Sequence, residues 1–564
     1  MIEWHPALPF FIAACLIPFL PAKLRQGVQI AVPILSFGML YFLISQGVDF
    51  VRLSPFPGVS FILMHFDRLA LFFAYAILTF SFLANIYALH AKEKFIHVAA
   101  NLYAGSSLGA VLAGDLGTLF VFWEMMAMAS TVLIWNKARP GSASSLLRYF
   151  LVHLTGGLFL FSGILLMFMD SGSFSLSAVE FNTAGWLIFI GFCVNAALVP
   201  LHAWLPDAYP EGTPMGSVYL SAFTTKVAVY AFARVFAGAD VLIWLGVISA
   251  VYGVIFALME NDMRRLLSYH IVCQIGYMIC GIGLGSDLGI NAGTAHAVGN
   301  ILFKGLLFMA TGALIHRTGK YKLNEMGGLF RENKMIFFFF MTGALAISGF
   351  PFLNGYISKV LLLKAAGKAH MEWLELILLL VTVGTFMSIA LKLAFFAFWG
   401  EGKSSTESLK PCPLNMYLAM AGTAFLCVGI GIFPRPFYAL FPFPQPYSVY
   451  TPDHILHTFQ LLIGTLFAFW LIVHRLHMKP VIALDVDWLY RRGALLFMKG
   501  ICEPLSMTQV YIQDRFTQSI ISLDQAFKSF FPSQSISSVG RPLLMILAGG
   551  LVIGTVFFLS ASRP

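Results

Sequence analysis

The sequence predicts an all-α, polytopic membrane protein with about 14–16 transmembrane helices. Of its 564 residues, 59% are apolar and only 11% are charged, whereas soluble domains carry roughly 25% charged residues. The apolar residues also fall into long runs, and a helix that crosses a bilayer needs about 20 of them. Soluble enzymes, nucleic-acid-binding proteins and secreted disulfide-rich proteins are therefore poor candidates.

Sixteen apolar runs define the expected spans, and the twelfth of them is interrupted. Each run is long enough to cross the hydrocarbon core alone or with its flanks. In chain order the spans are 8–21, 28–46, 69–90, 95–113, 116–135, 146–169, 184–204, 215–236, 241–259, 265–284, 292–315, 335–366, 374–399, 415–435, 457–475 and 541–560.

The net charge of +9 comes from Lys and Arg in short loops between the apolar runs. Basic loops follow the first, third, fifth, ninth and eleventh spans, while the loops between them are neutral or acidic. By the positive-inside rule, the basic loops are cytoplasmic and the N-terminus is outside. The expected location is therefore the cell (inner) membrane, which the chain crosses many times. We also expect the N-terminal segment to be retained.

Two expected spans are broken by Pro and Gly. The seventh runs into Val199–Pro206 and the twelfth is interrupted at Gly349–Gly355. Such breaks survive in a bilayer only where protein or a water-filled cavity satisfies the freed backbone groups. Broken helices at corresponding positions of two halves are typical of inverted-repeat transporters with an ion path at the breaks. The alternative is two ordinary proline kinks.

The remaining features concern cofactors and the C-terminal region. The seven cysteines are scattered without metal-ligand spacing, so we expect no metal, haem, iron–sulfur or other cofactor site. Residues 476–540 mix charged and apolar side chains and predict an amphipathic helix on the membrane or along neighbouring spans. A solvated linker is the alternative for this stretch.

Ionisable side chains inside several spans are the main candidates for function. An ionisable group at the centre of a span costs roughly 2.5–3.5 kcal/mol, so it needs a partner, water or a function. A series of carboxylate, lysine and histidine groups can pass protons through intervening water, and we predict a proton relay of Glu124, Lys226, His296, Lys304 and Lys359. Secondary candidates are Asn195, His153, Arg148, His202, expected to cap freed carbonyls, and Lys392, expected to extend toward an end of its helix.

Ordered motifs lie between roughly residues 95 and 400. They are Trp123-Glu-Met-Met126, Val199-Pro-Leu-His-Ala-Trp-Leu-Pro-Asp-Ala208, Thr213-Pro-Met-Gly-Ser217, Lys226-Val-Ala-Val-Tyr230, Asp262-Met-Arg-Arg-Leu-Leu-Ser-Tyr269, Gln274-Ile-Gly-Tyr277, Leu302-Phe-Lys-Gly-Leu-Leu-Phe308 and Ser348-Gly-Phe-Pro351 through Ser358-Lys359. They resemble the antiporter-like subunits shared by respiratory complex I, membrane-bound hydrogenases and Mrp-type Na⁺/H⁺ antiporters. Segments 226–234 and 398–401 look most like the D-type subunits of Mrp antiporters, while the number of spans resembles the longest complex I subunit.

The resemblance implies a fold, a domain plan and roles for individual residues. It implies fourteen core helices, inverted five-helix repeats and a hydrated row of charges that contains the five predicted relay residues. Asn195 occupies the position where the family usually has a lysine, and Asn300 stands where many relatives have a histidine. The first half-channel is then either rewired, with Lys226 or His153 pairing with Glu124, or does not conduct protons. The implied regions are 1–93 (N-terminal helices), 94–236 and 237–400 (the two repeats), 401–475 (C-terminal helices), 476–540 (an amphipathic lateral segment) and 541–564 (a final transmembrane helix).

Two functions are consistent with the sequence. The first is a subunit that translocates protons, or exchanges Na⁺ for H⁺, within an Mrp-like, hydrogenase-like or complex I-like assembly of membrane subunits. Any redox step would then belong to partner subunits, since this chain shows no catalytic site. The second is a non-conducting structural or coupling subunit, or a partner of another ion or bicarbonate transporter, and Asn195 favours it.

Overall fold

The fold is described from a computed structural model. The structure describes residues 4–56, 59–400, 409–444 and 447–473, together with scattered positions between 485 and 525. The chain divides into one unit of residues 1–487 and a second of residues 488–564. The expected final span at 541–560, and most of the expected amphipathic segment at 476–540, lie outside the described residues.

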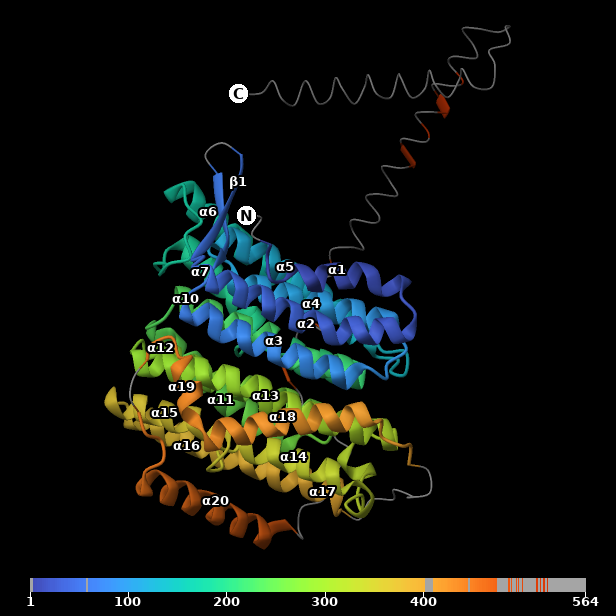
Figure 1. The fold of residues 1–564 in the computed structure, drawn as a ribbon, viewed down its shortest axis with the longest axis vertical. Coiled ribbons are helices and arrows are strands. Elements are labelled where there is room, and N and C mark those ends of the chain that lie inside the picture. The colour runs from blue at the N-terminus through green and yellow to red at the C-terminus, as the bar shows by residue number, and fades with distance from the viewer. Residues whose placement is uncertain are drawn as a thin grey trace. The chain divides into compact units, whose positions relative to one another are not determined.

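The described part of the first unit is an almost entirely helical bundle (Figure 1). Side-chain caps begin several helices: Asp67 accepts from the backbone N–H of Ala70, and Asp115 accepts from that of Thr118. Up to residue 235 the elements are α1 (Leu8–Leu16), η1 (Ile17–Phe19), α2 (Ala22–Ser45), β1 (Phe50–Phe56), β2 (Val59–His65), α3 (Arg68–Ala88), α4 (Lys94–Leu112), α5 (Leu116–Ile134), α6 (Ser142–Ser171), α7 (Thr183–Ala196), α8 (Trp204–Ala208), η2 (Tyr209–Glu211), α9 (Pro214–Leu220) and α10 (Thr224–Val235).

The helices after residue 235 continue the bundle. One of them contains a π-helical segment, η5, between α16 and α17. The elements are α11 (Asp240–Met259), α12 (Met263–Gly283), α13 (Asp287–Thr318), η3 (Leu323–Glu325), η4 (Arg331–Asn333), α14 (Lys334–Ile347), α15 (Asn354–Lys368), α16 (Glu372–Thr385), η5 (Phe386–Leu393), α17 (Ala394–Phe398), α18 (Leu414–Ile432), α19 (Pro434–Ala439) and α20 (Pro452–Ile472).

The expected membrane spans agree well with these helices. Among the described residues, 11 helices are long and apolar enough to cross a membrane, which confirms the predicted class of an all-α protein with many spans, while the inverted repeats stay a prediction. The first, seventh, eighth and twelfth expected spans are short or divided helices. The sequence did not predict the antiparallel hairpin of β1 and β2, which pair from Phe50 with His65 to Phe56 with Val59.

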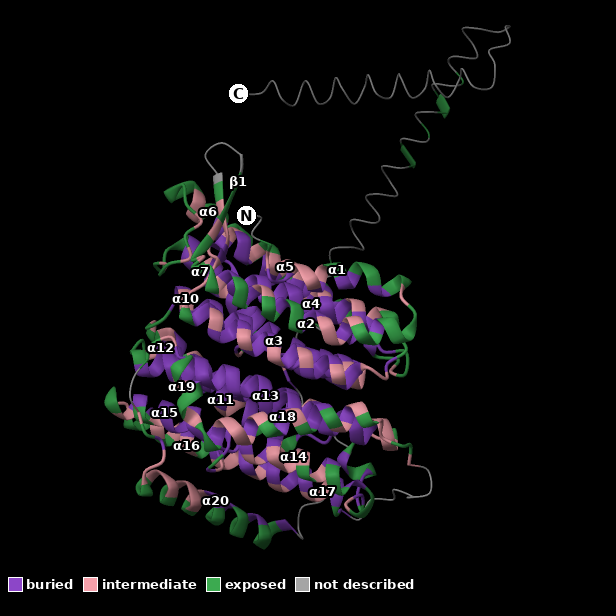
Figure 2. Ribbon diagram, in the orientation of Figure 1, coloured by how far each residue is buried: buried purple, intermediate pink, exposed green. Residues whose placement is uncertain are grey.

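The core of the bundle is formed by two helices that are buried along their most apolar stretches. These are α12 and α13, whereas α20 is mostly exposed within the described part of the chain (Figure 2). α13 packs against α9, α12, α14, α15 and α18, so it lies between the two halves of the bundle. A helix surrounded by others on all sides can carry polar groups away from lipid. Like those of α12, the side chains on the apolar stretch of α13 are therefore shielded from lipid by the described helices.

Both predicted breaks are present. α7 ends at Ala196, and Ala197 adopts a left-handed conformation with φ 55°; α14 ends at Ile347, and φ is 76° at Gly349 and 69° at Phe352. A left-handed conformation is costly for residues other than glycine, so Ala197 and Phe352 store local backbone strain. Strained backbone at two helix breaks inside a bundle is typical of functional sites.

The second break depends on a close approach at Gly355. A Cβ added there would overlap the carbonyl oxygen of Ala346 on α14. We expect Gly355→Ala to destabilise the protein by about 3 kcal/mol, since the backbones on either side of the break must separate. Gly429→Ala on α18 is the matched control, because nothing lies within 4 Å of its added Cβ. Thermal unfolding in detergent checks this, and equal midpoints for the two variants would contradict it.

Candidate functional site

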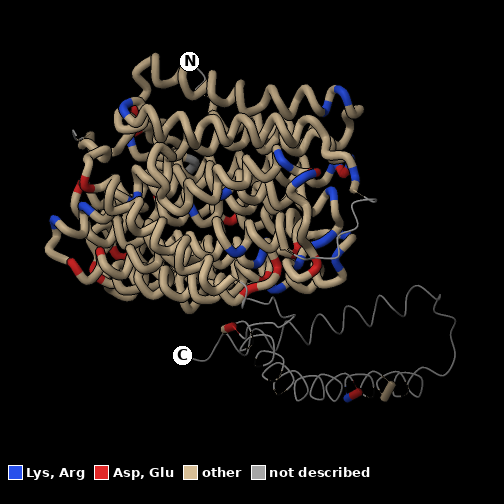
Figure 3. Tube along the Cα trace, turned by 90° about the horizontal axis from the view of Figure 1, so that it is seen from below, with Lys and Arg blue, Asp and Glu red and all other residues tan. Residues whose placement is uncertain are grey.

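Most charged residues lie toward the ends of the helices, but a few lie inside the bundle (Figure 3). The buried ones include Lys226 on α10, His296 and Lys304 on α13 and Lys359 on α15, each at most 5% exposed. The ring of Tyr277 contacts both the ring of His296 and Nζ of Lys359. Lys304 lies two turns after His296 on α13, and α10, which carries Lys226, packs against α13. Four of the five predicted relay residues therefore lie on helices that pack together around α13, and we call these four the basic row.

Glu124 lies on α5, where the sequence places it. Its carboxylate packs against Gly157 of α6, since a Cβ added to Gly157 would overlap Oε1 of Glu124. Oε1 is buried and accepts no hydrogen bond in the described structure. Neither His153 nor Lys226 lies within salt-bridge distance of Glu124. The pairing of Glu124 with Lys226 or His153, which was one of the two alternatives for the first half-channel, is therefore not formed as a direct ion pair.

Asn195 pairs with His153 instead. The Oδ1 atom of Asn195 and Nδ1 of His153 are 2.7 Å apart, and both residues are buried. The imidazole also contacts the rings of Tyr149 and Trp204, with centroids at 4.1 and 4.5 Å. Nε2 of His153 is buried without a hydrogen-bond partner in the described structure. Because His153 lies one helical turn before Gly157, the Asn195–His153 pair and Glu124 contact adjacent turns of α6.

Lys226 lies at a third break, which the sequence did not predict. The expected eighth span divides into α9 and α10 at Ser221–Phe223. Nζ of Lys226 donates to the backbone carbonyl of Ser221 at 2.8 Å. Lys226 is therefore in the first turn of α10, and not in the middle of a continuous helix. Its ammonium satisfies a carbonyl at the break where the helix is interrupted.

Lys304 and Lys359 differ in their surroundings. Nζ of Lys304 is fully buried and has no hydrogen-bond partner in the described structure. Nζ of Lys359 donates to Oγ1 of Thr382 at 3.2 Å and lies 4.9 Å from the ring centroid of Tyr277. The ring of Tyr277 offers a cation–π contact to a charged lysine. Of the two, only Lys359 is held by neighbours that stabilise its ammonium.

His296 has partners for both ring nitrogens. Nε2 lies 2.9 Å from Oε1 of Gln274, and Nδ1 lies 2.8 Å from Oγ of Ser358. The Ser358 hydroxyl can also donate to the carbonyl of Gly355 at 3.2 Å. It can thus donate to a neutral imidazole, or turn to Gly355 and accept from a protonated one. The site accommodates both protonation states of His296 through rotation of a single hydroxyl group.

The sequence led us to expect that His202 caps freed backbone carbonyls. In the structure it contacts a carboxylate instead. Its Nε2 lies 3.2 Å from a carboxylate oxygen of Asp485, and both side chains are fully buried. Asp485 also accepts from the hydroxyls of Tyr252 at 2.5 Å and Tyr269 at 2.6 Å. The first break is therefore linked to a residue that follows α20 in the sequence. Asp485 was not among the predicted site residues, because nothing in its sequence neighbourhood points to a partner so far away.

The other secondary candidates hold helix ends together. Arg148 forms a bidentate ion pair with Asp207 on α8, at 2.7 and 2.9 Å. Lys392 was expected to extend toward an end of its helix, but it is buried, and its Nζ donates to the carbonyls of Leu258 and Glu260 at the end of α11, at 2.6 and 2.7 Å.

Asn300 is buried, and its amide has no hydrogen-bond partner in the described structure.

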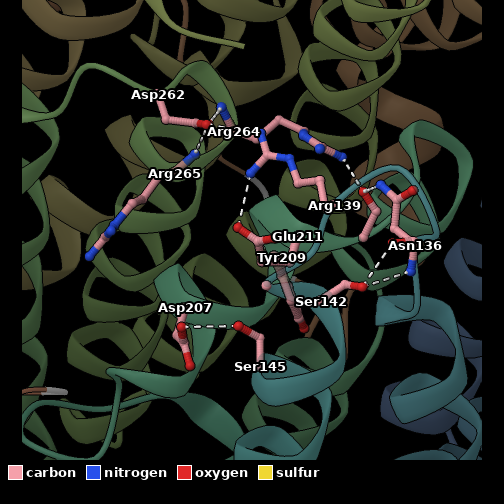
Figure 4. Close-up of polar contacts among 12 residues, drawn as sticks. Asn136, Arg139, Ser142, Ser145, Asp207, Tyr209, Glu211, Asp262, Arg264 and Arg265 are labelled. Atoms are coloured by element: carbon pink, nitrogen blue, oxygen red, sulfur yellow. Dashed lines mark hydrogen bonds and ion pairs between the residues drawn. The ribbon is translucent and has the colours of Figure 1, made fainter. Parts of the chain in front are cut away.

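A polar cluster joins three loops at one end of the bundle (Figure 4). Arg139 bridges Glu211 at 3.0 Å and Asp262 at 3.2 Å, and Arg264 donates to the carbonyl of Gly212 at 2.7 Å. Burial alone would lower the pKa of the Arg139 guanidinium, but Asp262 and Glu211 more than offset this and hold its pKa above the usual value. The cluster therefore fastens the loops that follow α5, α8 and α11 to one another.

Taken together, these contacts define a multi-span membrane protein whose interior holds a row of titratable groups next to broken helices. Among the described residues, no group of three or more His, Cys, Asp or Glu could hold a metal ion. Such a row can carry protons, because each of its groups can take up and release one.

Comparison with known proteins places this architecture in a family. Residues 113–388 match the family model "NADH:quinone oxidoreductase/Mrp antiporter, TM". The A-type Na⁺/H⁺ antiporter subunit of Alkalihalophilus pseudofirmus is 28% identical over an alignment of 505 residues that covers 77% of this chain and 61% of that protein. The D-type subunit of the antiporter from the same organism is 28% identical over 368 residues, covering 62% of this chain and 73% of that protein.

A solved structure shows the same fold. A chain of the membrane-bound sulfane sulfur reductase, an archaeal respiratory membrane complex, superposes with a TM-score of 0.72 at 23% identity, covering 98% of this chain and 99% of that chain. Residues 113–388 thus match the model of the NADH:quinone oxidoreductase/Mrp antiporter membrane domain, and the chain is similar to Na⁺/H⁺ antiporter subunits.

Proposed function

We propose that the protein is a proton-translocating, or Na⁺/H⁺-exchanging, subunit of a larger membrane complex. The observation that carries the proposal is the pair of fully buried, titratable residues on α13. Lys304 has no hydrogen-bond partner among the described residues, and His296 has neighbours that accommodate both of its protonation states. An unpaired buried lysine costs stability and is kept where its charge has a function.

The proposed relay runs from Glu124 through Lys226, Lys304 and His296 to Lys359. The two regions 94–236 and 237–400 would act as repeats that meet at α13. We further propose that other membrane subunits are its partners, because the proteins it matches are named as subunits or solved as part of a complex. In this proposal the loops joined by the polar cluster of Figure 4 face the cytoplasm, since they carry basic residues.

The test of this function is proton transport by the intact complex in everted vesicles. We expect Glu124→Gln to lower transport by about tenfold or more, because the amide cannot take up a proton. Assembly should be unchanged, since Glu124 forms no ion pair within the described structure that the change would break. Glu375→Gln, at the end of the bundle on α16, is the matched control. Transport within twofold of wild type in Glu124→Gln would remove Glu124 from the relay.

A second candidate function has one observation in its favour. Asn195 cannot be protonated to a cation, and its partner His153 is enclosed by the rings of Tyr149 and Trp204. The first repeat could then be structural while the second conducts. Normal transport in Glu124→Gln, combined with loss of transport when Lys304 is replaced, would support this arrangement.

A further inference from the structure

A buried histidine outside the predicted relay lies between the basic row and one end of the bundle. His270 is on α12 and is fully buried. Lys359 lies over the ring of Tyr277, two turns after His270 on α12, and Lys392 bonds the carbonyls of Leu258 and Glu260, which precede α12. Along α12, His270 therefore lies between a lysine of the basic row and the lysine that caps the end of α11.

The hydrogen bonds of His270 fix its orientation. Its Nε2 lies 2.7 Å from Oγ of Ser388. The hydroxyl of Ser388 donates to the carbonyl of Gly384 at 2.7 Å, so its oxygen accepts the Nε2–H of a neutral imidazole. Nδ1 then carries the free lone pair, and it is buried without a hydrogen-bond partner in the described structure. The ring is thus held as a proton acceptor at Nδ1.

The helix that faces His270 has an unusual geometry. Ser388 and Lys392 both lie in the π-helical segment η5. π-helical turns are rare and occur frequently at functional sites. Lys392 donates to the carbonyls of Leu258 and Glu260, and the carboxylate of Glu260 accepts from the backbone N–H groups of Asn261 and Asp262. Ionisable and polar groups thus continue from His270 to the loop between α11 and α12.

The geometry points to His270 and Lys392 as a proton route that connects the basic row with the 260–262 end of the bundle, with Ser388 orienting the His270 ring. A proton from Lys359 or Lys304 adds to Nδ1 of His270 and gives an imidazolium. The Nε2 proton then leaves on the Ser388 side and passes through water to Lys392. The neutral ring then carries its proton on Nδ1, and transfer of that proton through water to Nε2 restores the starting tautomer, so that one proton has entered the route and one has left it. This route rests on the proposed function, since it has no purpose in a non-conducting subunit.

The alternative is that His270 only fastens α12 to η5. His270→Gln separates the two roles, because the Gln amide can still donate to Ser388 but cannot be protonated. We expect transport per assembled complex to fall by about tenfold or more, with the thermal midpoint unchanged. His97→Gln is the matched control: His97 is also buried, and it is bonded to the carbonyl of Ala91 far along the chain from the route.

Two further variants interpret the result. Lys304→Met is measured in parallel. If His270→Gln transports protons normally while Lys304→Met does not, the route is overturned and the proposed function is left intact. If His270→Gln also lowers the thermal midpoint, Ser388→Ala decides, since it removes the cross-link and leaves the titratable ring. If transport per folded complex falls as far in Ser388→Ala as in His270→Gln, the loss is due to the missing cross-link and the route is overturned. If transport is better retained in Ser388→Ala, the result supports the route.

Discussion

Replacement of Lys304 by Met is expected to stop proton transport and at the same time to make the protein more stable. Lys304 is fully buried, and its Nζ has no hydrogen-bond partner among the described residues. An uncompensated charge, or an amine held neutral by burial, costs free energy that Met of similar volume does not. We expect transport to fall by about tenfold or more, and the thermal midpoint of the purified complex to rise by a few degrees.

The control for Lys304 is a lysine of the same chemistry in an exposed position. Lys364 lies on α15 and is exposed, so Lys364→Met should leave both quantities unchanged. Lys304→Arg tests the mechanism, because arginine keeps the charge but does not deprotonate in proteins. Normal transport in Lys304→Arg would mean that Lys304 acts as a fixed charge, and the relay would have to pass elsewhere.

The sequence predicted the spans well because their signal is local. A run of about 20 apolar residues is visible in one segment of chain, and the breaks at 197–203 and 348–353 are marked by Pro and Gly. The third break, at Ser221–Phe223, contains neither residue and was therefore missed. Its cause is tertiary: the hydroxyl of Tyr103 on α4 accepts from the backbone N–H of Thr224 and takes part in starting α10 there.

The relay residues were predictable one at a time, but their partners were not. A lysine in an apolar run stands out in the sequence, and His270 would have been found by the same criterion applied to 265–284. The proximity of Asn195 to His153, or of Ser388 to His270, depends on how helices pack over separations of 42 and 118 residues. Such pairs have no periodic signal, so the expectation that His153 or Lys226 pairs with Glu124 could not be checked before the structure.

The contacts of Asp485 were the least predictable from the sequence, and its replacement should have the second of the two large effects, a loss of stability and transport. In Asp485→Asn, one hydroxyl of Tyr252 and Tyr269 loses its acceptor, and the carboxylate beside Nε2 of His202 is lost. A buried donor left without an acceptor typically costs about 1–3 kcal/mol. We therefore expect a lower thermal midpoint and loss of transport, because the first break is no longer held from the segment that follows α20.

The control is Asp453→Asn, since Asp453 is exposed in the first turn of α20. Tyr252→Phe removes a single donor to Asp485 and should have an intermediate effect, as expected if the hydroxyls and His202 act on one carboxylate. Thermal unfolding and vesicle transport of the three variants measure this. If Asp485→Asn behaves like Asp453→Asn, the buried carboxylate does not hold the first break, and His202 must be positioned by its ring contact with Tyr252 alone.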